Sequence, residues 1–297
     1  MKFVTMRKKS VFKMALAIVF AAAVIAGVSI TGAATVWSGR SPKRIAIYSV
    51  DTPLQVVALT FNVHNTNSAI TRTAINDIIP VYEEGDFIND ELPENGEKDE
   101  TKTASCCNGI THALSQLENH NIEATFFVSG LWAKQFAPTL NSIVSSNRAE
   151  IGNFSSTHPE RFHRLNAHQL EAEIRTANTT INNLARVTPK VFRAPNGLYS
   201  DRVLETANAE GLVSVQGDIH IANDGVMNNE QIVLKVLNSV QNGSIIMIDI
   251  TDCCVEFEAL PLIIMGLQRR GFSFVRVSDL VLRENYTLDR AGRQFRA

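Results

Sequence analysis

The segment EIGNFSSTHPERF, residues 150–162, contains a histidine, His158, that is followed by a proline and preceded four positions earlier by Phe154. Two histidines at this spacing after a strand would predict a metal site, because imidazole nitrogens are common zinc ligands. In this chain a phenylalanine, which has no donor atom, holds the first position. The segment therefore allows three interpretations: a metal enzyme, the descendant of one, or a chance likeness.

The elements that would position these residues are apolar, strand-like runs that alternate with amphipathic stretches. The runs predicted as strands cover residues 56–63, 124–130, 149–154, 190–195, 212–218, 244–250 and 272–277. The clearest helical stretches cover residues 110–121, 167–187 and 258–271, the last closed by Gly271 as a C-cap. Strands that alternate with helices predict parallel βα units, and seven units around one core indicate a distorted (β/α)7 barrel of the α/β class.

In such barrels the residues that end the strands carry the chemistry. We therefore expect seven side chains to meet on one rim, namely those of Asn62, Val63, Phe154, His158, Arg193, Asp218 and Asp249. His64 follows the first strand and is interpreted as the start of the next segment. His220 follows a strand end, and the sequence names no partner for it.

The N-terminus has the pattern of a membrane anchor. Basic residues among positions 1–13 precede an uncharged apolar run at residues 14–38, long enough for a membrane span of about 20 residues. We expect the basic segment to stay in the cytoplasm and the rest of the chain to lie outside it, as in a single-pass membrane protein. A cleaved signal peptide, with Gly32 and Ala34 as a small-residue cleavage site, is the main alternative, but its apolar core is usually about 7–15 residues. A buried helix of a globular domain is the third interpretation.

The rest of the chain divides into a stalk at residues 39–54, a domain at residues 55–285 and a tail at residues 286–297. One long segment, residues 64–106, separates the first strand from its helix, where connections of about 2–6 residues are usual. This insertion is rich in acidic residues. It is interpreted either as a lid or cation-attracting arm, or as a solvated insertion, which its composition favours.

Several motifs occur together and in order: VALTF, HNIEATFFVSG, EIGNFSSTHP, FRAPNG, NGSIIM and EALPLIIMGLQRRGFSFVRVSDL. They resemble the motifs of the polysaccharide deacetylases, the NodB-homology family or carbohydrate esterase family 4. The resemblance covers about residues 43–282. With IAIYSVDTP and the apolar N-terminus, the chain looks most similar to the sporulation-associated, PdaB-like branch of that family.

The resemblance implies a specific chemistry, the removal of acetyl groups from N-acetylated sugars. In the family a divalent metal, usually zinc, polarises the acetyl carbonyl and supplies a water nucleophile. A carboxylate base takes the proton of the water, and a histidine acts as the acid. A Thr-Phe-Asp-Asp motif gives the base and one metal ligand, a His-x-x-x-His motif gives two ligands, and a Leu-x-His motif gives the acid.

This chain departs from the family at most of those positions. Asn62 stands in the place of the base and Val63 in the place of the first ligand. Phe154 replaces the first histidine of the second motif, so His158 is the only retained ligand position, and Asp249 stands in the place of the acid. Since zinc sites need about three protein ligands, we expect no metal cofactor. Zinc or another divalent metal would bind only if the site has been rebuilt.

The third motif, RAPNG, keeps Arg193, Pro195 and Gly197, while Asn196 replaces the usual aromatic residue. The resemblance makes Phe154, Pro195, Asn196 and Gly197 the candidate binding residues, and Phe154 could offer a stacking face to a sugar or fill the space of the lost site. In the family the arginine holds the base. Because Asn62 is neutral and a buried guanidinium without a carboxylate is costly, we expect Arg193 to pair with Asp249. The alternative is a solvated carboxylate at the rim.

Four cysteines form two adjacent pairs, Cys106 with Cys107 and Cys253 with Cys254. The first pair is expected just before the first helix, and the second after the strand that ends at Asp249. An even number outside the cytoplasm favours a disulfide between the pairs. Free thiols and a thiolate metal site that includes His158 or His64 are the alternatives.

The function predicted from the sequence is that of a membrane-anchored, catalytically degenerate polysaccharide deacetylase homologue. It would act as a glycan-binding or interaction module of the cell envelope in sporulation, with a cell-wall glycan or an envelope protein as partner. The alternatives are an active metal-dependent N-deacetylase of peptidoglycan or related amino sugars, and a scaffold that uses the acidic insertion. The net charge of −2 gives no argument for nucleic acid as a partner.

Overall fold

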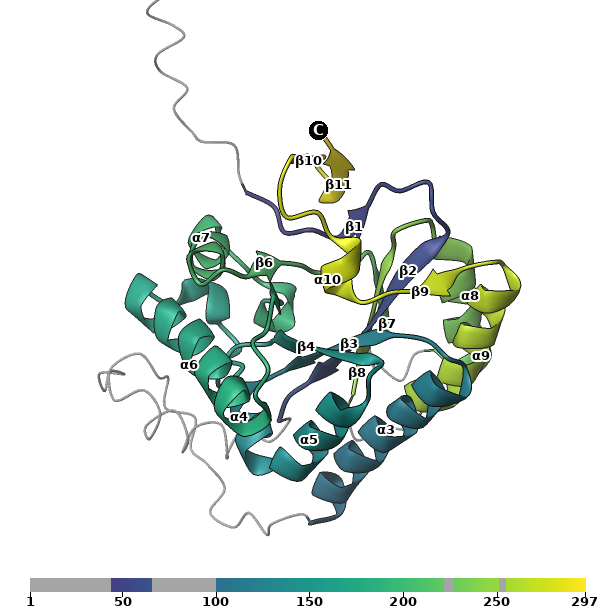
Figure 1. The fold of residues 1–297 in the computed structure, drawn as a ribbon, viewed down its shortest axis with the longest axis horizontal. Helices are drawn as coiled ribbons and strands as arrows, with labels where there is room; N and C mark the ends of the chain where they lie inside the picture. Colours follow the sequence, from purple (N-terminus) through teal and green to yellow (C-terminus); the bar gives the residue numbers. More distant parts are fainter. Residues whose placement is uncertain (1–43, 66–99, 222–226, 251–254) are drawn as a thin grey trace, which may run out of the picture. The chain divides into compact units, whose positions relative to one another are not determined.

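The computed structural model describes residues 44–65, 100–221, 227–250 and 255–297, and for residues 100–108 and 255–257 it describes the backbone alone (Figure 1). Residues 44–297 form one compact unit. No helix in these described ranges is long and apolar enough to cross a membrane. The predicted anchor at residues 14–38 lies outside the described residues.

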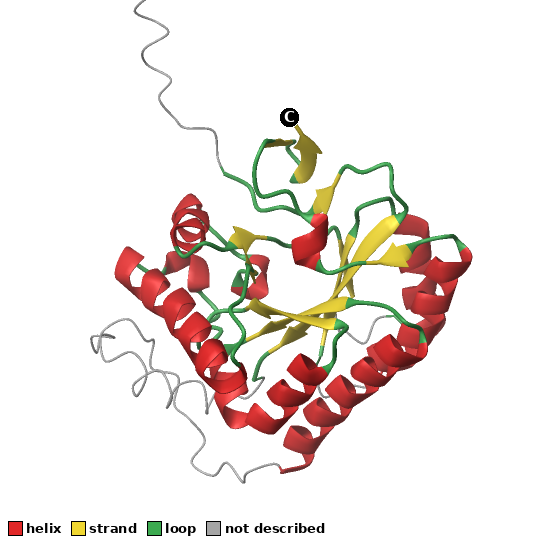
Figure 2. Ribbon diagram, viewed as in Figure 1, coloured by secondary structure: helices red, strands yellow, loops and turns green. Residues whose placement is uncertain are grey.

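A parallel sheet forms the centre of the domain, with helices packed around it (Figure 2). Its central strands are β2 (Val56–Val63), with β3 (Ala124–Val128) and β4 (Ala149–Asn153) on one side and β8 (Ile245–Asp249) on the other. The outer strands are short: β5 (Val191–Phe192) and β6 (Val213–Ser214) follow β4, β7 (Ile219–Ile221) follows β8, and β9 (Ser273–Phe274) pairs with β2. In the described part of the chain β6 and β7, the two ends of the sheet, do not pair, so the sheet does not close on itself. The expected barrel of parallel strands is therefore confirmed only in part, as an incomplete barrel.

The longer helices lie outside the strands and supply the other half of each βα unit. They are α3 (Glu100–Asn119), α5 (Ala137–Ser145), α6 (Ala167–Ala185), α7 (Asp201–Ala209), α8 (Asn229–Ser239) and α9 (Val255–Arg269). Short helical segments complete the set: α4 (Gly130–Gln135), η1 (Phe162–Arg164), η2 (Pro195–Gly197) and α10 (Val277–Leu280). Gly271 ends the α9 region with a positive φ of 87°, as a C-cap glycine does.

Strand β2 explains why some residues reach the rim and others do not. Successive side chains of a strand point to opposite faces. Leu59, Phe61 and Val63 lie in the main apolar cluster, together with residues of α3 and α9 such as Leu117 and Leu267. Thr60 and Asn62 alternate with them and face the interior of the barrel, where Arg193 binds both. The side chain of Val63 is fully buried in that cluster.

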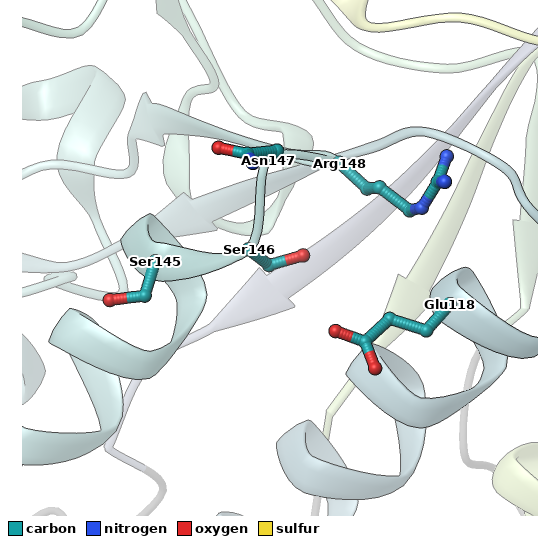
Figure 3. Close-up of a pocket in the computed structure, with 5 residues that line it drawn as sticks. All are labelled: Glu118, Ser145, Ser146, Asn147 and Arg148. Atoms are coloured by element: carbon teal, nitrogen blue, oxygen red, sulfur yellow. The ribbon is translucent and has the colours of Figure 1, made fainter.

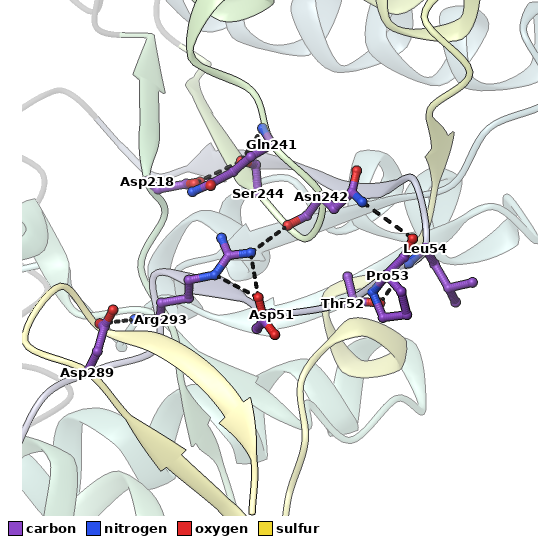
Figure 4. Close-up of polar contacts among 10 residues, drawn as sticks. All are labelled: Asp51, Thr52, Pro53, Leu54, Asp218, Gln241, Asn242, Ser244, Asp289 and Arg293. Atoms are coloured by element: carbon purple, nitrogen blue, oxygen red, sulfur yellow. Dashed lines mark hydrogen bonds and ion pairs between the residues drawn. The ribbon is translucent and has the colours of Figure 1, made fainter.

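The strand β7 was missed, and with it the position of Asp218. The sequence predicts one strand over residues 212–218, whereas the chain forms β6, turns, and begins β7 at Ile219. Gly217 lies in the turn, and a Cβ atom there would lie 2.6 Å from the carbonyl oxygen of Ile245. Asp218 therefore precedes β7, and its carboxylate accepts hydrogen bonds from Ser244 Oγ at 2.8 Å and from the backbone N–H of Ile245 at 2.8 Å (Figure 4). It lies at the amino end of the strands, so its predicted place on the rim was wrong.

Both ends of the described chain meet in a second, small sheet. Strand β11 (Arg293–Arg296) pairs in parallel with β1 (Ser49–Val50) and antiparallel with β10 (Tyr286–Leu288). Arg293 Nη2 lies 3.1 Å from Asp51 Oδ1 and 3.3 Å from the carbonyl oxygen of Asn242 (Figure 4). The segments predicted as a stalk and a tail thus belong in part to the domain, because their backbones hydrogen-bond to each other.

The first helix begins earlier than the sequence predicts. It was expected over residues 110–121, whereas α3 starts at Glu100 and includes Cys106 and Cys107. The first cysteine pair therefore lies within a helix and not before it, and residues 100–106 of the expected insertion are helical. The cysteine side chains, Cys253, Cys254 and most of the acidic insertion lie outside what the structure describes.

Candidate functional site

The carboxyl ends of β2 and β8, together with the residue that follows β5, bring Asn62, Asp249 and Arg193 together. Asn62 and Asp249 are paired residues on neighbouring parallel strands. Arg193 follows β5, and its side chain crosses the barrel interior to Thr60 and Asn62 on β2. We use the word rim for this end of the barrel, where polar side chains follow strongly apolar strands.

Arg193 is a buried guanidinium held by several acceptors. It is 1% exposed, and its carbon Cζ lies 3.9 Å from the centre of the Phe127 ring. Nη1 donates to Asn62 Oδ1 at 2.7 Å and to Thr60 Oγ1 at 2.9 Å, and Nη2 donates to the carbonyl oxygen of Gln216 at 3.1 Å. Burial lowers the pKa of Arg193, and the negative charge of Asp249 opposes that effect. The side chain remains a cation at neutral pH.

Asn62 stands between this cation and the carboxylate of Asp249. Its amide nitrogen Nδ2 donates to Asp249 Oδ1 at 2.7 Å, while its oxygen Oδ1 accepts from Arg193. An amide can do both, because it has an acceptor end and a donor end. The direct contact expected between Arg193 and Asp249 is therefore corrected: among the described residues the two charges are linked through the asparagine.

The second oxygen of Asp249 binds a histidine that the sequence did not assign. Asp249 Oδ2 lies 2.7 Å from His220 Nε2, and the lysine Lys235 donates its Nζ to the backbone oxygen of His220 at 2.8 Å. Burial raises the pKa of Asp249, but the hydrogen bonds from His220 and Asn62 outweigh it and hold that pKa below its usual value. The sequence did contain a signal for this histidine. His220 alternates with Ile219 and Ile221, which are buried, so its side chain points to the other face of the strand.

Three rings pack on the other side of the site. The rings of His64 and His158 are parallel within 7°, with centroids 3.8 Å apart, and the Phe154 ring meets His158 edge-on at 4.4 Å. Burial lowers the pKa of both histidines, and for His158 the neighbouring His64 lowers it further. Phe154 is only 3% exposed, so it fills space and does not offer a stacking face to a sugar. His64 was expected merely to begin the insertion, whereas its ring belongs to this cluster.

The loop that carries Phe154 and His158 is shaped by a buried carboxylate, Glu173 on α6. Glu173 accepts hydrogen bonds at 2.9 Å from the backbone N–H groups of Ser156 and Thr157, and at 2.6 Å from Thr157 Oγ1. Burial raises the pKa of Glu173, and these hydrogen bonds oppose the rise. His158 itself has a positive φ of 55°, a left-handed backbone conformation that is uncommon for residues other than glycine. Glu173 was not predicted from the sequence, in which only the apolar residues on the same face of the helix could have indicated its burial.

A metal ion does not fit the residues present. Val63 and Phe154 have no donor atoms, and His158 Nε2 is buried without a hydrogen-bond partner in the described part of the chain. Within the same part, no three His, Cys, Asp or Glu side chains lie close enough to hold a metal. The His64 and His158 rings are nearly parallel, so the lone pairs that lie in the two ring planes do not point to one shared ion.

The remaining candidates lie around these groups. Pro195, Asn196 and Gly197 form η2, in which Pro195 is buried and the other two are exposed, with Asn196 at a φ of 54°. A separate polar hollow lies before β4, away from the rim, and its lining is shown in Figure 3: Glu118, Ser145, Ser146, Asn147 and Arg148. None of the residues that the sequence singled out lines this hollow.

The fold is an incomplete parallel α/β barrel with polar side chains at its carboxyl rim, and comparison with known proteins gives the family. The polysaccharide deacetylase profile matches residues 106–215. A chitooligosaccharide deacetylase of Sinorhizobium fredii is 30% identical over 172 residues, which cover 54% of this chain and 79% of that protein. The chain belongs to the polysaccharide deacetylase family.

Two further comparisons concern length and fold. A bifunctional xylanase/deacetylase of Pseudobutyrivibrio xylanivorans is 30% identical over 171 residues, which cover 57% of this chain and only 28% of that protein. The crystal structure of a pseudoenzyme of carbohydrate esterase family 4 from Bacillus anthracis superimposes with a TM-score of 0.62 at 20% identity, over 80% of this chain and 68% of that one. At this identity the likeness concerns the fold.

Proposed function

We propose that this polysaccharide deacetylase homologue has lost metal-dependent deacetylation and binds cell-wall glycan at its rim. The observation that carries the proposal is the link from Arg193 through Asn62 to Asp249, at 2.7 Å on each side. In the family's reaction a carboxylate at position 62 takes a proton from water. Here an amide holds that position with both its donor and its acceptor occupied, and an amide takes up no proton near neutral pH.

The metal positions support the same conclusion. Val63 is fully buried among apolar side chains, and Phe154 is buried beside His158. Polarisation of an acetyl carbonyl by a metal would need about three ligands at this point, and only one remains.

An active enzyme with a rebuilt site is the second candidate, and one observation favours it. His64 and His158 lie ring on ring, and His158 Nε2 lacks a hydrogen-bond partner among the described residues. A rotation of either ring could turn two nitrogens toward one ion, with further ligands from the cysteines. A scaffold that uses the acidic insertion is the third candidate, and it requires neither metal nor glycan.

Metal content of the purified full-length chain separates these candidates. The protein would be incubated with zinc under reducing conditions, dialysed, and assayed for bound metal and for release of acetate from acetylated cell-wall oligosaccharides. We expect no tightly bound zinc and no acetate, together with retention of the protein on insoluble peptidoglycan. One equivalent of zinc that disappears in His158→Ala would support the rebuilt enzyme instead. Absence of both zinc binding and glycan binding would support the third candidate, a scaffold that uses the acidic insertion.

We further propose that residues 14–38 anchor the protein in the cell membrane with its domain outside the cytoplasm, and that it acts in sporulation. The length of the apolar run and its basic flank support the anchor, and the motifs that resemble the sporulation-associated branch suggest the second part of the proposal. Fractionation of cells, followed by protease treatment of intact spheroplasts, tests the orientation. A full-length chain that stays in the soluble fraction would contradict the anchor.

A further inference from the structure

The rim exposes only part of its polar network. Asn62, Phe154 and Arg193 are each at most 6% exposed, so these family positions have little surface for a ligand. The side chains of His220 and Asp249 are 45% and 25% exposed. Among these five side chains, His220 and Asp249 therefore offer a ligand the most surface.

We propose that His220 and Asp249 are the ligand-contacting pair of the rim and that they select an amino sugar with a free amino group over its N-acetylated form. This inference rests on the proposed glycan binding and names the class of sugar. Asp249 stands where the family has its acid histidine, and its pairing with His220 joins two neighbouring strands, β7 and β8.

The pair offers acceptors and few donors. Asp249 is held ionised by its two hydrogen bonds, and an ionised carboxylate only accepts. Each of its oxygens has used one lone pair, which leaves capacity for further donors. When His220 Nε2 carries the proton that Asp249 accepts, the other ring nitrogen, Nδ1, is also an acceptor. A sugar ammonium has three donors and a positive charge, and so matches this surface.

An acetamide matches it poorly, because its carbonyl oxygen needs a donor. Among the described residues, the cations Arg193 and Lys235 already make hydrogen bonds within the domain. Arg193 donates from its terminal nitrogens to Asn62, Thr60 and Gln216 inside the barrel. Lys235 donates to the backbone oxygen of His220, on the side of the main chain.

The network also fixes the pair in place. Asn62 is held by Arg193 and in turn holds one oxygen of Asp249, while His220 is held at its ring and at its backbone. Groups that are ordered before binding lose less conformational entropy when a ligand arrives. The buried residues Asn62 and Arg193 therefore hold Asp249 in place for a ligand, which makes them positioning residues.

Isothermal titration calorimetry of the full-length chain in mild detergent, at about pH 7, tests the inference. The probes are two oligomers of equal length, one of β-1,4-linked glucosamine and one of N-acetylglucosamine. We expect the free-amine oligomer to bind about 10- to 100-fold more tightly, the range of a charge-assisted hydrogen bond. Asp249→Asn should bring the two affinities close together, because it removes the charge and replaces one acceptor by a donor.

Matched variants separate contact from folding. His220→Gln should weaken binding of the free-amine oligomer, whereas His168→Gln, which changes an exposed histidine on α6, should leave it unchanged. Thermal unfolding of each variant checks the fold. Equal or tighter binding of the acetylated oligomer would overturn the selectivity while glycan binding stands. No binding of either oligomer would overturn both proposals, and an unchanged preference in both Asp249→Asn and His220→Gln would remove the pair from the site.

Discussion

The amide of Asn62 donates a hydrogen bond to the carboxylate of Asp249 across two neighbouring strands, with 2.7 Å between nitrogen and oxygen. On its other side the same amide accepts from Arg193 at 2.7 Å. The family places its catalytic carboxylate at position 62, and this chain has its carboxylate on the next strand. Compared with the family, the negative charge near the buried Arg193 therefore lies on the neighbouring strand β8. The amide of Asn62 occupies the position of the family's carboxylate.

This arrangement predicts that Asn62→Asp alone is unfavourable. Two carboxylates would then face each other at hydrogen-bond distance, and like charges that close cannot both stay ionised. We expect the variant to lose about 1–3 kcal/mol of unfolding free energy near neutral pH and to recover part of it in acid, where the pair shares a proton. Urea unfolding at several pH values measures this.

The exchange Asn62→Asp with Asp249→Asn supplies the control. It keeps one amide and one carboxylate but places the carboxylate directly on Arg193, so the double variant should be more stable than Asn62→Asp. A double-mutant cycle over the four proteins gives the coupling, which we expect to favour the exchanged pair by at least about 1 kcal/mol. Additive effects would show that Asn62 and Asp249 do not interact as described.

Asp249 also predicts how stability depends on pH. The hydrogen bonds from His220 and Asn62 hold the folded-state pKa below the ordinary value of 3.8. A carboxyl with a lowered pKa contributes stability above its unfolded pKa and loses it as the pH falls through the folded value. The cost of Asp249→Asn should therefore be largest near neutral pH and shrink below about pH 4. Denaturation curves of both proteins between neutral and acid pH test this, and a cost that grows in acid would contradict it.

Much of the frame could be predicted because its signals are local. Strand β2 has the predicted bounds, since a short run rich in valine and other apolar residues is typical of a buried strand. The short strand β7 could not be predicted, because Gly217 allows a turn within what looks like one run. That error placed Asp218 at the wrong end of the barrel and left His220 without its partner.

The site was predictable as a set of positions and not as a geometry. The family motifs locate Asn62, Phe154, Arg193 and Asp249. Whether Arg193 meets Asp249 directly or through Asn62 depends on side-chain directions on three different strands, about which the order of residues says little. The stack of His64 on His158 is likewise a contact between residues 94 positions apart in the numbering.

The burial of Phe154 predicts a packing role. Phe154→Ala should cost about 3–5 kcal/mol of unfolding free energy, because it removes a buried ring and leaves a cavity beside His158. Phe154→Leu, which fills most of that space, should cost clearly less. If the ring instead contacted sugar, the alanine variant would lose glycan binding with little change in stability, so calorimetric binding and urea unfolding on the same variants distinguish the two roles.

Gln294 offers a test of whether the C-terminal segment belongs to the domain. It is fully buried in β11, donates from Nε2 to the carbonyl oxygen of Leu282 at 2.7 Å and accepts from the Leu282 N–H at 2.8 Å. Gln294→Ala removes both hydrogen bonds to the partly buried backbone of Leu282, and a backbone group that is left buried without a partner costs about 1–3 kcal/mol. We expect a clear fall in melting temperature. The matched variant Arg296→Ala, which changes an exposed side chain of the same strand, should melt close to the parent. Equal melting temperatures for the Gln294 variant and the parent would mean that β10 and β11 are an appendage with no part in the stability of the fold.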